Sequence, residues 1–426
     1  MNNCLILLTN YYPFYKGEEY LETEIGYLSN KFKQIYIIAT MAYKGMEQTR
    51  KIPENAIALP VDIKHSICRK IKMVLHKGSS IHKDPNKREM LKKDSEGKII
   101  NRLYNYYFES RAMEIYDNVV KLLDNFDFDK YDSITLYSYW LYITARVAVE
   151  LKDRYFNKKS PYTFSRAHGY DINEHANLLN FLPERKYLLD SLHNIFPVSQ
   201  KGVNFLQTKY PKYANKIEVR RLGTRQPDIR VSPVMTKKSK CFHIVSCSTV
   251  RKLKRINLII DALEILQSKG IVFHWTHIGE GPQFKYIKKL ANKKLNKDSF
   301  TFTGYIKNDE VINWYQQNSA NVFVNTSSSE GVPVSIMEAM SMGIPIIATD
   351  VGGTSEIVQD NINGYLIGKD CTASQIAEKI LNLYKMDIDK YYDMSSNSLA
   401  IWKEKCNSDT LYSCFAEQIA KYRANG

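Results

Sequence analysis

Residues 320–356 constrain the fold of this chain most strongly, because they place a short helix between two apolar strands. Apolar runs at 320–324 and 344–348 predict the strands, and the residues between them predict a helix at about 334–342. Pro333 suits the first position of that helix, and Gly343 is expected to end it. Strands separated by a helix in this way are typical of a parallel sheet.

Two carboxylates flank the predicted start of this helix. The backbone amides of Val334, Ser335 and Ile336 are expected to be free there, which makes a site for a phosphate. Glu330 lies on the preceding loop, and Glu338 lies just inside the helix, with seven residues between them. Hydrogen-bond acceptors around an anion site suit a ligand with both diols and phosphate, and a nucleotide sugar is such a ligand.

The wider pattern resembles a known family. Glu-Gly-x-Pro, the short helix, Gly-x-Pro and Val-Gly-Gly-x-x-Glu follow one another over residues 330–356. This order resembles glycosyltransferase family 4, the retaining nucleotide-sugar transferases with a GT-B fold, and the resemblance covers most of the C-terminal half. It implies that Glu330 contacts the transferred sugar and that Glu338 contacts the ribose hydroxyls. The other donor-binding residues that it implies are Gly331, Val332, Pro333, Val334 and Ser335 on this segment, and Gly304, Tyr305 and Ile306 beside the base.

A basic loop at 249–255 follows another predicted strand. Cations fixed beside a departing diphosphate stabilise its growing negative charge. By resemblance, Lys254 is the lysine on the diphosphate, and we assign it, with Glu330, to the catalytic residues. The family usually has an arginine five residues before this lysine, where the chain has Thr249. Arg251 or Arg255 could supply that charge, and we assign Arg251 to donor binding.

The first half offers candidate residues at the ends of its predicted strands. Gly17 lies between the first strand and the first helix, where glycine lets a backbone approach a ligand or simply makes a turn. By resemblance, it borders the diphosphate, and His168, in Arg-x-His-Gly-x-Asp, is the active-site histidine. A structural role for this histidine is the alternative. On the acceptor side we assign Lys16, Tyr139, Arg166 and Asp171.

Apolar runs alternate with amphipathic stretches along the 426 residues, which suit two domains. We predict an N-terminal domain at 1–225, a nucleotide-sugar-binding domain at 226–408, and a last helix at about 409–426 that packs back on the first domain. Pro- and Lys-rich residues 226–240 are the predicted linker. The expected fold class is α/β, with two Rossmann-like doubly wound domains that face each other across a cleft, as in GT-B.

The formal charge of +15 is concentrated in one insertion, because residues 64–102 hold 12 basic and 4 acidic residues. Ile67, Ile71, Val74 and Leu75 recur near helical spacing there, which predicts a basic amphipathic helix followed by a polar loop. The helix would either contact an anionic membrane surface or pack its apolar stripe on the domain. Simple solubility also explains such charge. No recognition motif for nucleic acid accompanies it.

Other patterns point away from membrane spans, disulfides and metals. No run of about 18 apolar residues exists, and the N-terminus lacks the basic start of a secretory signal. We therefore expect a cytoplasmic protein, peripheral on the inner membrane face. The seven cysteines are scattered and the histidines show no metal pattern, so no metal or other cofactor is expected. Asp127-Phe-Asp129 and Asp387-Ile-Asp389 match a metal-binding pattern only by chance.

The resemblance implies a metal-independent, retaining hexosyltransferase. Its donor would be a nucleotide sugar, with a UDP-sugar favoured, and its acceptor a hydroxyl of a growing surface glycan such as capsule or lipopolysaccharide, linked to a polyprenyl lipid. A GDP-sugar donor of mannosyl type is one alternative. A non-catalytic partner subunit that keeps the fold is another.

Overall fold

The computed structural model describes residues 2–15, 17–63, 67–177, 179–227 and 241–421. The chain divides into two compact units, residues 1–221 with 412–426 and residues 222–411. None of the helices in the described ranges is long and apolar enough to cross a membrane. The predicted linker at 226–240 lies mostly outside the described residues.

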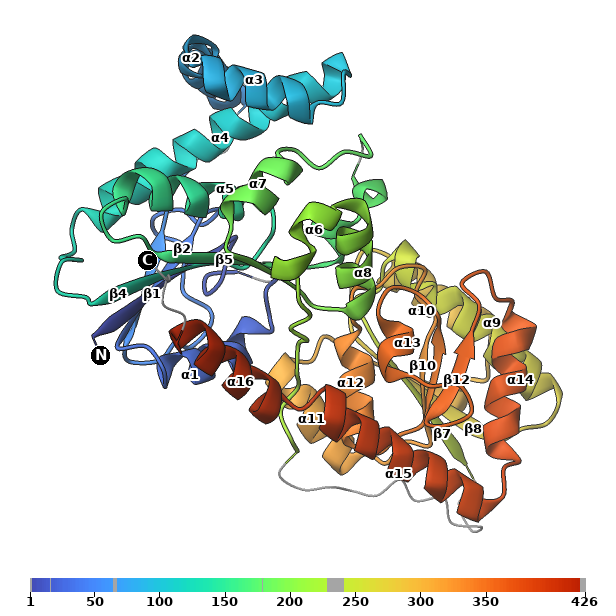
Figure 1. Cartoon of the computed structure of the whole chain (residues 1–426). Coiled ribbons are helices and arrows are strands. Elements are labelled where there is room, and N and C mark those ends of the chain that lie inside the picture. Colours follow the sequence, from blue (N-terminus) through green and yellow to red (C-terminus); the bar gives the residue numbers. More distant parts are fainter. Residues whose placement is uncertain (1, 16, 64–66, 178, 228–240, 422–426) are drawn as a thin grey trace. The chain divides into compact units, whose positions relative to one another are not determined.

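The first unit contains a six-stranded sheet in the order β3-β2-β1-β4-β5-β6, and every pair of neighbours is parallel (Figure 1). The strands are β1 Asn3–Thr9, β2 Gln34–Ala39, β3 Ala56–Pro60, β4 Ser133–Ser138, β5 Tyr162–Ala167 and β6 Asn194–Pro197. The helices are α1 Leu21–Ser29, α2 Ile67–Lys83, α3 Pro85–Asp94, α4 Ile99–Leu123, α5 Ile143–Glu150, α6 Gly169–Ile172, α7 Arg185–Ser191, α8 Gln200–Lys209 and α16 Ser408–Lys421, the last entering this unit at Tyr412. A π-helix, Leu151–Tyr155, extends α5, and 3-10 turns cover Glu174–Ala176 and Pro211–Lys216.

Helices cover both faces of this sheet. Successive side chains of a strand point to opposite faces, so each strand contributes to two core clusters. In β1, Ile6 and Leu8 belong to a core cluster with residues of α4 and α5, whereas Leu5 and Leu7 belong to a cluster with residues of α1 and α16. Strands buried on both faces read as continuous apolar runs, as β1 does.

The second unit repeats the pattern in the order β12-β11-β10-β7-β8-β9, again all parallel. Its strands are β7 Phe242–Cys247, β8 Phe273–Ile278, β9 Phe300–Gly304, β10 Val322–Asn325, β11 Ile346–Thr349 and β12 Gly364–Ile367. Its helices are α9 Ile256–Ser268, α10 Phe284–Lys294, α11 Asn308–Gln317, α12 Val334–Ser341, α13 Thr354–Ile357, α14 Ala373–Tyr384 and α15 Ile388–Lys405, with 3-10 turns at Lys252–Lys254 and Lys297–Ser299.

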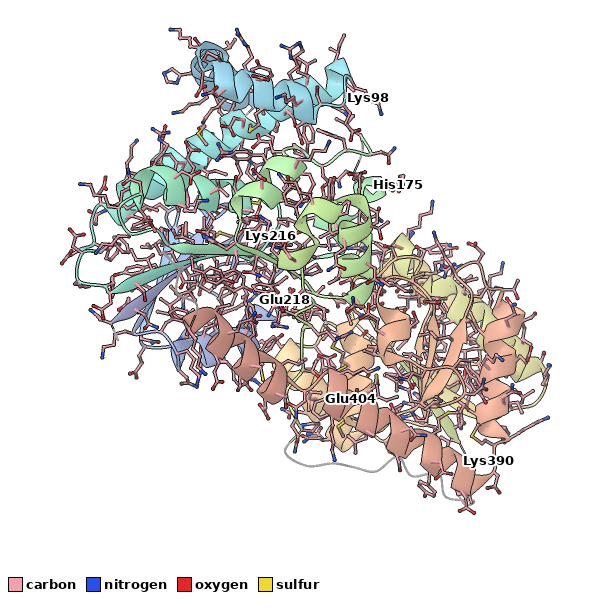
Figure 2. The ribbon with its side chains drawn as sticks, viewed as in Figure 1. Lys98, His175, Lys216, Glu218, Lys390 and Glu404 are labelled. Carbon is pink, nitrogen blue, oxygen red and sulfur yellow. The ribbon has the colours of Figure 1, made fainter. Side chains whose placement is uncertain are left out.

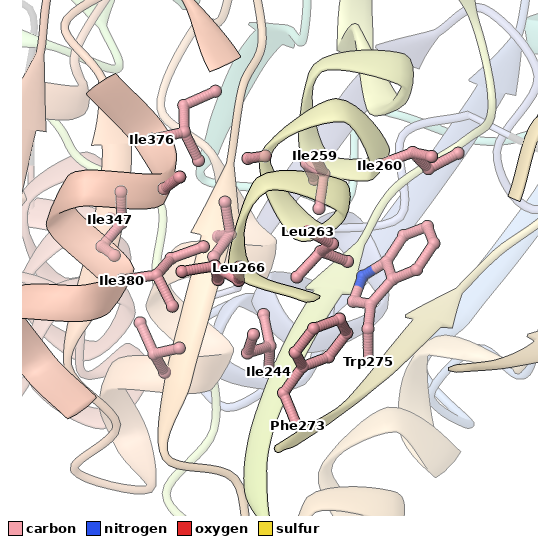
Figure 3. Packing of buried hydrophobic residues seen from close by; sticks show 14 of the residues in the cluster. Ile244, Ile259, Ile260, Leu263, Leu266, Phe273, Trp275, Ile347, Ile376 and Ile380 are labelled. Atoms are coloured by element: carbon pink, nitrogen blue, oxygen red, sulfur yellow. The ribbon is translucent and has the colours of Figure 1, made fainter. Parts of the chain in front are cut away.

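Aliphatic side chains fill the space between this sheet and α9 and α14. Figure 3 shows Leu263 and Leu266 of α9 close to Ile380 of α14, with Ile244 and Trp275 of the strands beside them. The same strand order in both units confirms the predicted fold class of two doubly wound α/β units.

The insertion differs from its prediction in one respect. A helix, α2, does form in it, but the polar loop expected after α2 is wrong, since α3 follows at once. The carboxylate of Asp84 accepts hydrogen bonds from the amides of Asn86 and Lys87, and Pro85 occupies the first helical position. An N-cap aspartate followed by proline is a strong helix start, and it overrides the polar composition of α3.

A buried ion pair joins the first unit's sheet to its helices. Arg166 of β5 and Glu24 of α1 are both fully buried, with 2.8 Å between Nη2 and Oε2. Arg166 also donates to the hydroxyl of Tyr137 and to the carbonyl of Arg220 at 2.7 Å each. The Phe415 ring of α16 covers the guanidinium, with its centroid 4.3 Å from Cζ. Four other segments of the first unit therefore contact the Arg166 side chain of β5.

Replacing Arg166 by alanine is predicted to destabilise the first unit by about 3–5 kcal/mol, because the buried Glu24 carboxylate loses its partner. Denaturant unfolding followed by circular dichroism measures this change. Lys93→Ala is the control, since Lys93 pairs with Glu89 at the surface and its loss is expected to change stability little. Equal midpoints for Arg166→Ala and wild type would contradict the prediction.

Candidate active site

In the second unit the winding direction of the sheet reverses between β7 and β10, which are neighbours. Ligands of doubly wound folds bind outside the carboxyl ends of the strands at such a reversal. Lys254 follows β7 and Glu330 follows β10, and 2.5 Å separates Nζ of Lys254 from Oε1 of Glu330. The structure thus brings together two residues that are 76 positions apart in the chain.

Arg255 fastens the two loops that carry this pair. Its guanidinium donates to the carbonyls of Thr326 at 2.7 Å, Ser327 at 3.2 Å and Lys369 at 2.6 Å. The hydroxyl of Thr326 donates back to the Lys254 carbonyl at 2.9 Å. Arg255 therefore stabilises the loops, and it is wrong as a substitute for the family arginine.

Arg251 remains the candidate second cation. It caps the short 3-10 turn that ends at Lys254, and its side chain is exposed. A small pocket lies beside this turn, at the carboxyl ends of β7 and β10. Its lining consists of Ser246, Cys247, Ser248, Lys254, Ile256, Ile259, Val324, Asn325, Thr326 and Ser327.

Helix α12 begins at Val334 as predicted, but Pro333 is its N-cap and not its first helical residue. The Ile336 amide donates to the Pro333 carbonyl at 3.2 Å, so the prediction that this amide is free is wrong. The amides of Val334 and Ser335 have no acceptor among the described residues. The helix ends as predicted, because Gly343 has φ of 72° and its amide donates to the Met340 carbonyl.

The glycines after β11 shape the loop that holds Glu330. A Cβ at Gly352, where φ is 55°, would lie 1.9 Å from the Glu330 carbonyl oxygen, so only glycine fits. The next amide, of Gly353, donates to the Gly331 carbonyl at 2.6 Å. The two glycines thus fix the backbone of Glu330 and Gly331. Sequence reasoning used these glycines only as a signature.

Glu338 lies inside α12 and is 8% exposed. Its carboxyl has no hydrogen-bond partner among the residues that the structure describes. Burial raises the pKa of Glu338 to about 8, and burial, with a smaller contribution from the Glu338 carboxyl, also raises the pKa of Cys247 and of Tyr315. At neutral pH Glu338 is therefore largely protonated, and it can donate as well as accept a hydrogen bond.

Loops after β8 and β9 complete this edge of the second unit. A Cβ at Gly279, where φ is 129°, would lie 2.1 Å from the Ser248 carbonyl oxygen. The Gly279 amide donates to the carbonyl of Gly304, the last residue of β9, at 2.8 Å. Tyr305 then follows, with 57% of its surface exposed, and Ile306 comes next. The predicted base-binding loop thus presents an accessible aromatic ring.

In the first unit His168 lies at the carboxyl end of β5 and is almost fully buried. Its Nε2 is 3.0 Å from the carbonyl oxygen of Tyr139, and its ring packs 4.5 Å from that of Trp140, centroid to centroid. Burial, with the charge of Arg166, lowers its pKa to about 3. The imidazole is therefore neutral at pH 7, with Nε2–H donating to the carbonyl.

The structure places three of the acceptor-side candidates in the interior of the first unit. Arg166 is consumed by the ion pair with Glu24, and Tyr139 is 1% exposed within the core. Asp171 is fully buried, and its carboxylate accepts from the amides of Leu141 at 2.7 Å and His168 at 2.5 Å. It therefore holds two strand-end loops together. Lys16 lies outside the described residues.

Gly17 lies in the predicted loop after β1, is exposed, and has φ of 98°. Its neighbour Glu18 was missed as a site residue. The Glu18 carboxylate is buried and accepts from the amides of Asn10, Tyr11 and Tyr12 at 2.8–2.9 Å. It also accepts from Nε1 of Trp140 at 2.7 Å. Glu18 therefore positions the Trp140 ring that packs on His168.

Neither Asp-x-Asp pair has the geometry of a metal site. Asp127 accepts from the amide of Asp129 at 2.9 Å, and Asp387 caps α15 through the amide of Asp389 at 3.0 Å. Within the described ranges no group of three histidine, cysteine or acidic side chains is placed to hold a metal.

Known proteins resemble this chain in sequence. The family described as Glycosyl transferases group 1 matches residues 230–399. The Putative colanic acid biosynthesis glycosyltransferase WcaL of Escherichia coli is 27% identical over 229 residues, which are 52% of this chain and 55% of WcaL. The Amylovoran biosynthesis glycosyltransferase AmsK of Erwinia amylovora is 26% identical over 182 residues, 41% of this chain and 44% of AmsK. The chain thus spans about half the length of these relatives.

Solved structures resemble it over nearly the whole length. HepE of Anabaena, in complex with UDP, has a TM-score of 0.66 and 18% identity, and the match covers 99% of this chain and 100% of HepE. The lipopolysaccharide outer core galactosyltransferase WaaB has a TM-score of 0.64 and 15% identity, with 98% of both chains covered. The fold is therefore that of the GT-B glycosyltransferases. The part of the chain that matches the group 1 family model, residues 230–399, falls largely in the second unit.

The pKa of Glu338 predicts a pH effect on stability. Between its ordinary value of 4.5 and about 8, the folded protein holds a proton that the unfolded chain releases. This carboxyl therefore adds stability at low pH, and the contribution is lost as pH rises through about 8. Glu338→Gln, which stays neutral, is predicted to remove that part of the slope.

The pH dependence is measured from denaturant unfolding midpoints of wild type and variant between pH 5 and pH 8.5, in steps of roughly one pH unit. Other buried acids titrate in both proteins, so the difference isolates Glu338. Glu404→Gln, at an exposed position of α15, is the control and should keep the wild-type slope. A Glu338→Gln slope equal to that of the wild type would refute the prediction.

Proposed function

We propose that this protein is a retaining glycosyltransferase that moves a hexose from a nucleotide sugar, most favourably a UDP-sugar, to a hydroxyl of a growing surface polysaccharide. One observation carries the proposal. Lys254 and Glu330 meet at the winding reversal of a group 1 domain, beside the free amides of Val334 and Ser335. A cation, a carboxylate and helix amides at that edge suit a ligand with both a diphosphate and a sugar.

The donor contacts follow from this arrangement. Lys254, with Arg251 and the α12 amides, binds the diphosphate, and Glu330 accepts from the sugar hydroxyls. The protonated carboxyl of Glu338, which lacks a partner in the described structure, binds the ribose diol. The loop of Gly304, Tyr305 and Ile306 borders the base.

In the transfer, the bond between the anomeric carbon and the diphosphate oxygen breaks. The acceptor oxygen bonds to that carbon, and its proton passes to the departing diphosphate. Attack on the same face accounts for retention. Lys254 stabilises the charge that develops on the leaving group. Neutral His168 orients the sugar or acceptor by hydrogen bonding, a role that suits its lowered pKa better than proton transfer does.

The names of similar proteins support the choice of substrates. WcaL and AmsK are named for the biosynthesis of colanic acid and amylovoran. HepE has been solved with UDP-glucose. We extend this to a metal-independent reaction on a lipid-linked glycan at the inner membrane face, as the family resemblance implies.

A nucleotide panel tests the donor. UDP is predicted to raise the melting temperature more than GDP or ADP at equal concentration, because a bound ligand stabilises the folded state. A larger shift with GDP would favour the GDP-sugar alternative. Lys254→Ala is predicted to weaken UDP binding roughly tenfold or more, since a charge-assisted contact is lost, while uridine, without a diphosphate, binds as before.

The control for Lys254 is Lys252→Ala, on the same short turn and exposed. This variant removes one positive charge from the turn but leaves the ion pair between Lys254 and Glu330 intact. Equal losses in the two variants would mean that the general field of the loop, and not Lys254, binds the diphosphate.

His168→Ala is predicted to lower turnover about 10- to 100-fold while donor affinity changes little, because a hydrogen bond in the transition state is lost. Nucleotide release from the donor measures turnover, and titration calorimetry measures affinity. His175→Ala, an exposed histidine of the same unit, is the control (Figure 2). Wild-type turnover in His168→Ala would remove this residue from the mechanism. A wild-type protein that turns over no donor would favour the non-catalytic alternative.

A further inference from the structure

The first turns of α4 have their polar and apolar faces reversed. Along the helix the buried positions recur at helical spacing, and from Phe108 onward most of them are apolar. The first two buried positions are instead Asn101 and Asn105, which are 3% and 0% exposed. The aliphatic residues face outward: Ile99, Ile100 and Leu103 are 78%, 53% and 61% exposed. A helix of a water-soluble unit normally shows the opposite arrangement.

Hydrogen bonds hold the asparagines inward. The side-chain amide of Asn105 donates to the Leu91 carbonyl at 3.1 Å and to the Asp94 carboxylate at 3.3 Å. That of Asn101 donates to the Ser95 carbonyl at 3.4 Å. These acceptors lie at the end of α3. If α4 rotated to bury its aliphatic side chains, the two asparagines would leave these acceptors, and buried polar groups would lose their hydrogen bonds.

The same assembly is fastened to the body of the first unit. Nζ of Lys87, on α3, lies 2.9 Å from Glu109 of α4. Glu109 pairs in turn with Arg146 of α5 at 2.8 Å, and both of these side chains are almost fully buried. The Asp94 carboxylate also accepts from the Glu184 amide at 2.6 Å. The exposed face is therefore a fixed part of the structure.

Positive charge surrounds this apolar face. Lys98 and Arg102 lie within the same two turns and are exposed, and Lys92 and Lys93 follow one another at the end of α3. Residues 64–102 together hold 12 basic and 4 acidic residues. Figure 1 shows α2, α3 and the start of α4 beyond the helices that cover the sheet, and Figure 2 labels Lys98 at the end of this projection.

We propose that Ile99, Ile100 and Leu103, with Lys98 and Arg102, form a docking face for an anionic lipid bilayer. The aliphatic side chains enter the boundary between headgroups and acyl chains, and the cations contact lipid phosphates. This places the determinant at the start of α4, whereas the sequence pattern pointed to α2. The proposal does not depend on the transfer activity.

Charge and apolarity together select this occupant. A nucleic acid would use the cations but would leave three aliphatic side chains in water. A protein partner would cover the aliphatic face but would gain less from a rim where exposed basic residues outnumber exposed acidic ones such as Glu96. An anionic bilayer satisfies both features, because binding grows with buried apolar area and with attraction to acidic lipids.

Vesicle co-sedimentation of the full-length protein tests the proposal. The probes are vesicles of phosphatidylcholine alone and of phosphatidylcholine with about one third phosphatidylglycerol. We expect binding to the anionic vesicles only, weakened by high salt. Ile99→Ser/Ile100→Ser/Leu103→Ser is expected to weaken it roughly tenfold or more, because the inserted area is lost. Lys98→Glu/Arg102→Glu is expected to do the same and is an independent variant should the first not fold.

Val272→Ser/Ile362→Ser is the matched control, since these aliphatic residues are 59% and 44% exposed in the second unit. It should bind vesicles as wild type does. Wild-type binding by the triple variant, or no binding of the wild-type protein to anionic vesicles, would overturn the proposal. The proposal would also be overturned if the triple variant bound vesicles as wild type does but differed from it in oligomeric state, measured by light scattering, or in DNA binding.

Discussion

Parallel strands present all their carboxyl ends at one edge of a sheet, and in each unit the winding direction reverses between two central strands. Loops that leave neighbouring strands toward opposite faces cannot pack fully against each other, so their residues stay available to a ligand. In the second unit this constraint brings Lys254 to Glu330. In the first unit it brings the loop of Glu18, after β1, to Trp140, after β4.

The two reversals have opposite electrostatic character. The first-unit loops satisfy their own polar groups, because Glu18 fills the ring of amides that could otherwise bind an anion. The second-unit loops leave the amides of Val334 and Ser335 without acceptors in the described structure. Within the described residues, the second-unit loops therefore offer unmatched donors to an anion, whereas the corresponding donors of the first unit are already taken.

Periodicity and breaking residues explain why much of this could be predicted from the sequence. The strands on either side of α12 were predicted from the apolar runs at 320–324 and 344–348, and β10 and β11 form there. The end of α12 was predicted because Gly343 suits the left-handed conformation of a helix C-terminus. The roles of Lys254 and Glu330 were predicted from the family resemblance. A family motif specifies a residue together with the residues that surround it in the fold.

Contacts between distant segments explain what could not be predicted. Arg166 and His168 are two residues apart at the end of the same strand, yet Arg166 is fully buried beneath Phe415. The ring that covers Arg166 belongs to α16, which lies more than two hundred residues later in the chain. In the sequence, nothing distinguishes Glu18 from its neighbour Glu19. Only the structure shows that Glu18 accepts a hydrogen bond from Trp140, 122 residues away. Contacts between residues this far apart cannot be predicted from the residues that surround either one in the sequence.

The departure at Thr249 has a physical counterpart in the charges of the second-unit site. The ammonium of Lys254 is matched by the carboxylate of Glu330, so one cation and one anion balance there. A diphosphate adds more negative charge than Lys254 alone can offset. On the proposed assignment the difference falls to Arg251, which is exposed, and to the partial positive charge of the α12 N-terminus. Glu338 adds no charge of its own while it stays protonated, so its burial beside the diphosphate site lowers the repulsion that a second carboxylate would otherwise bring.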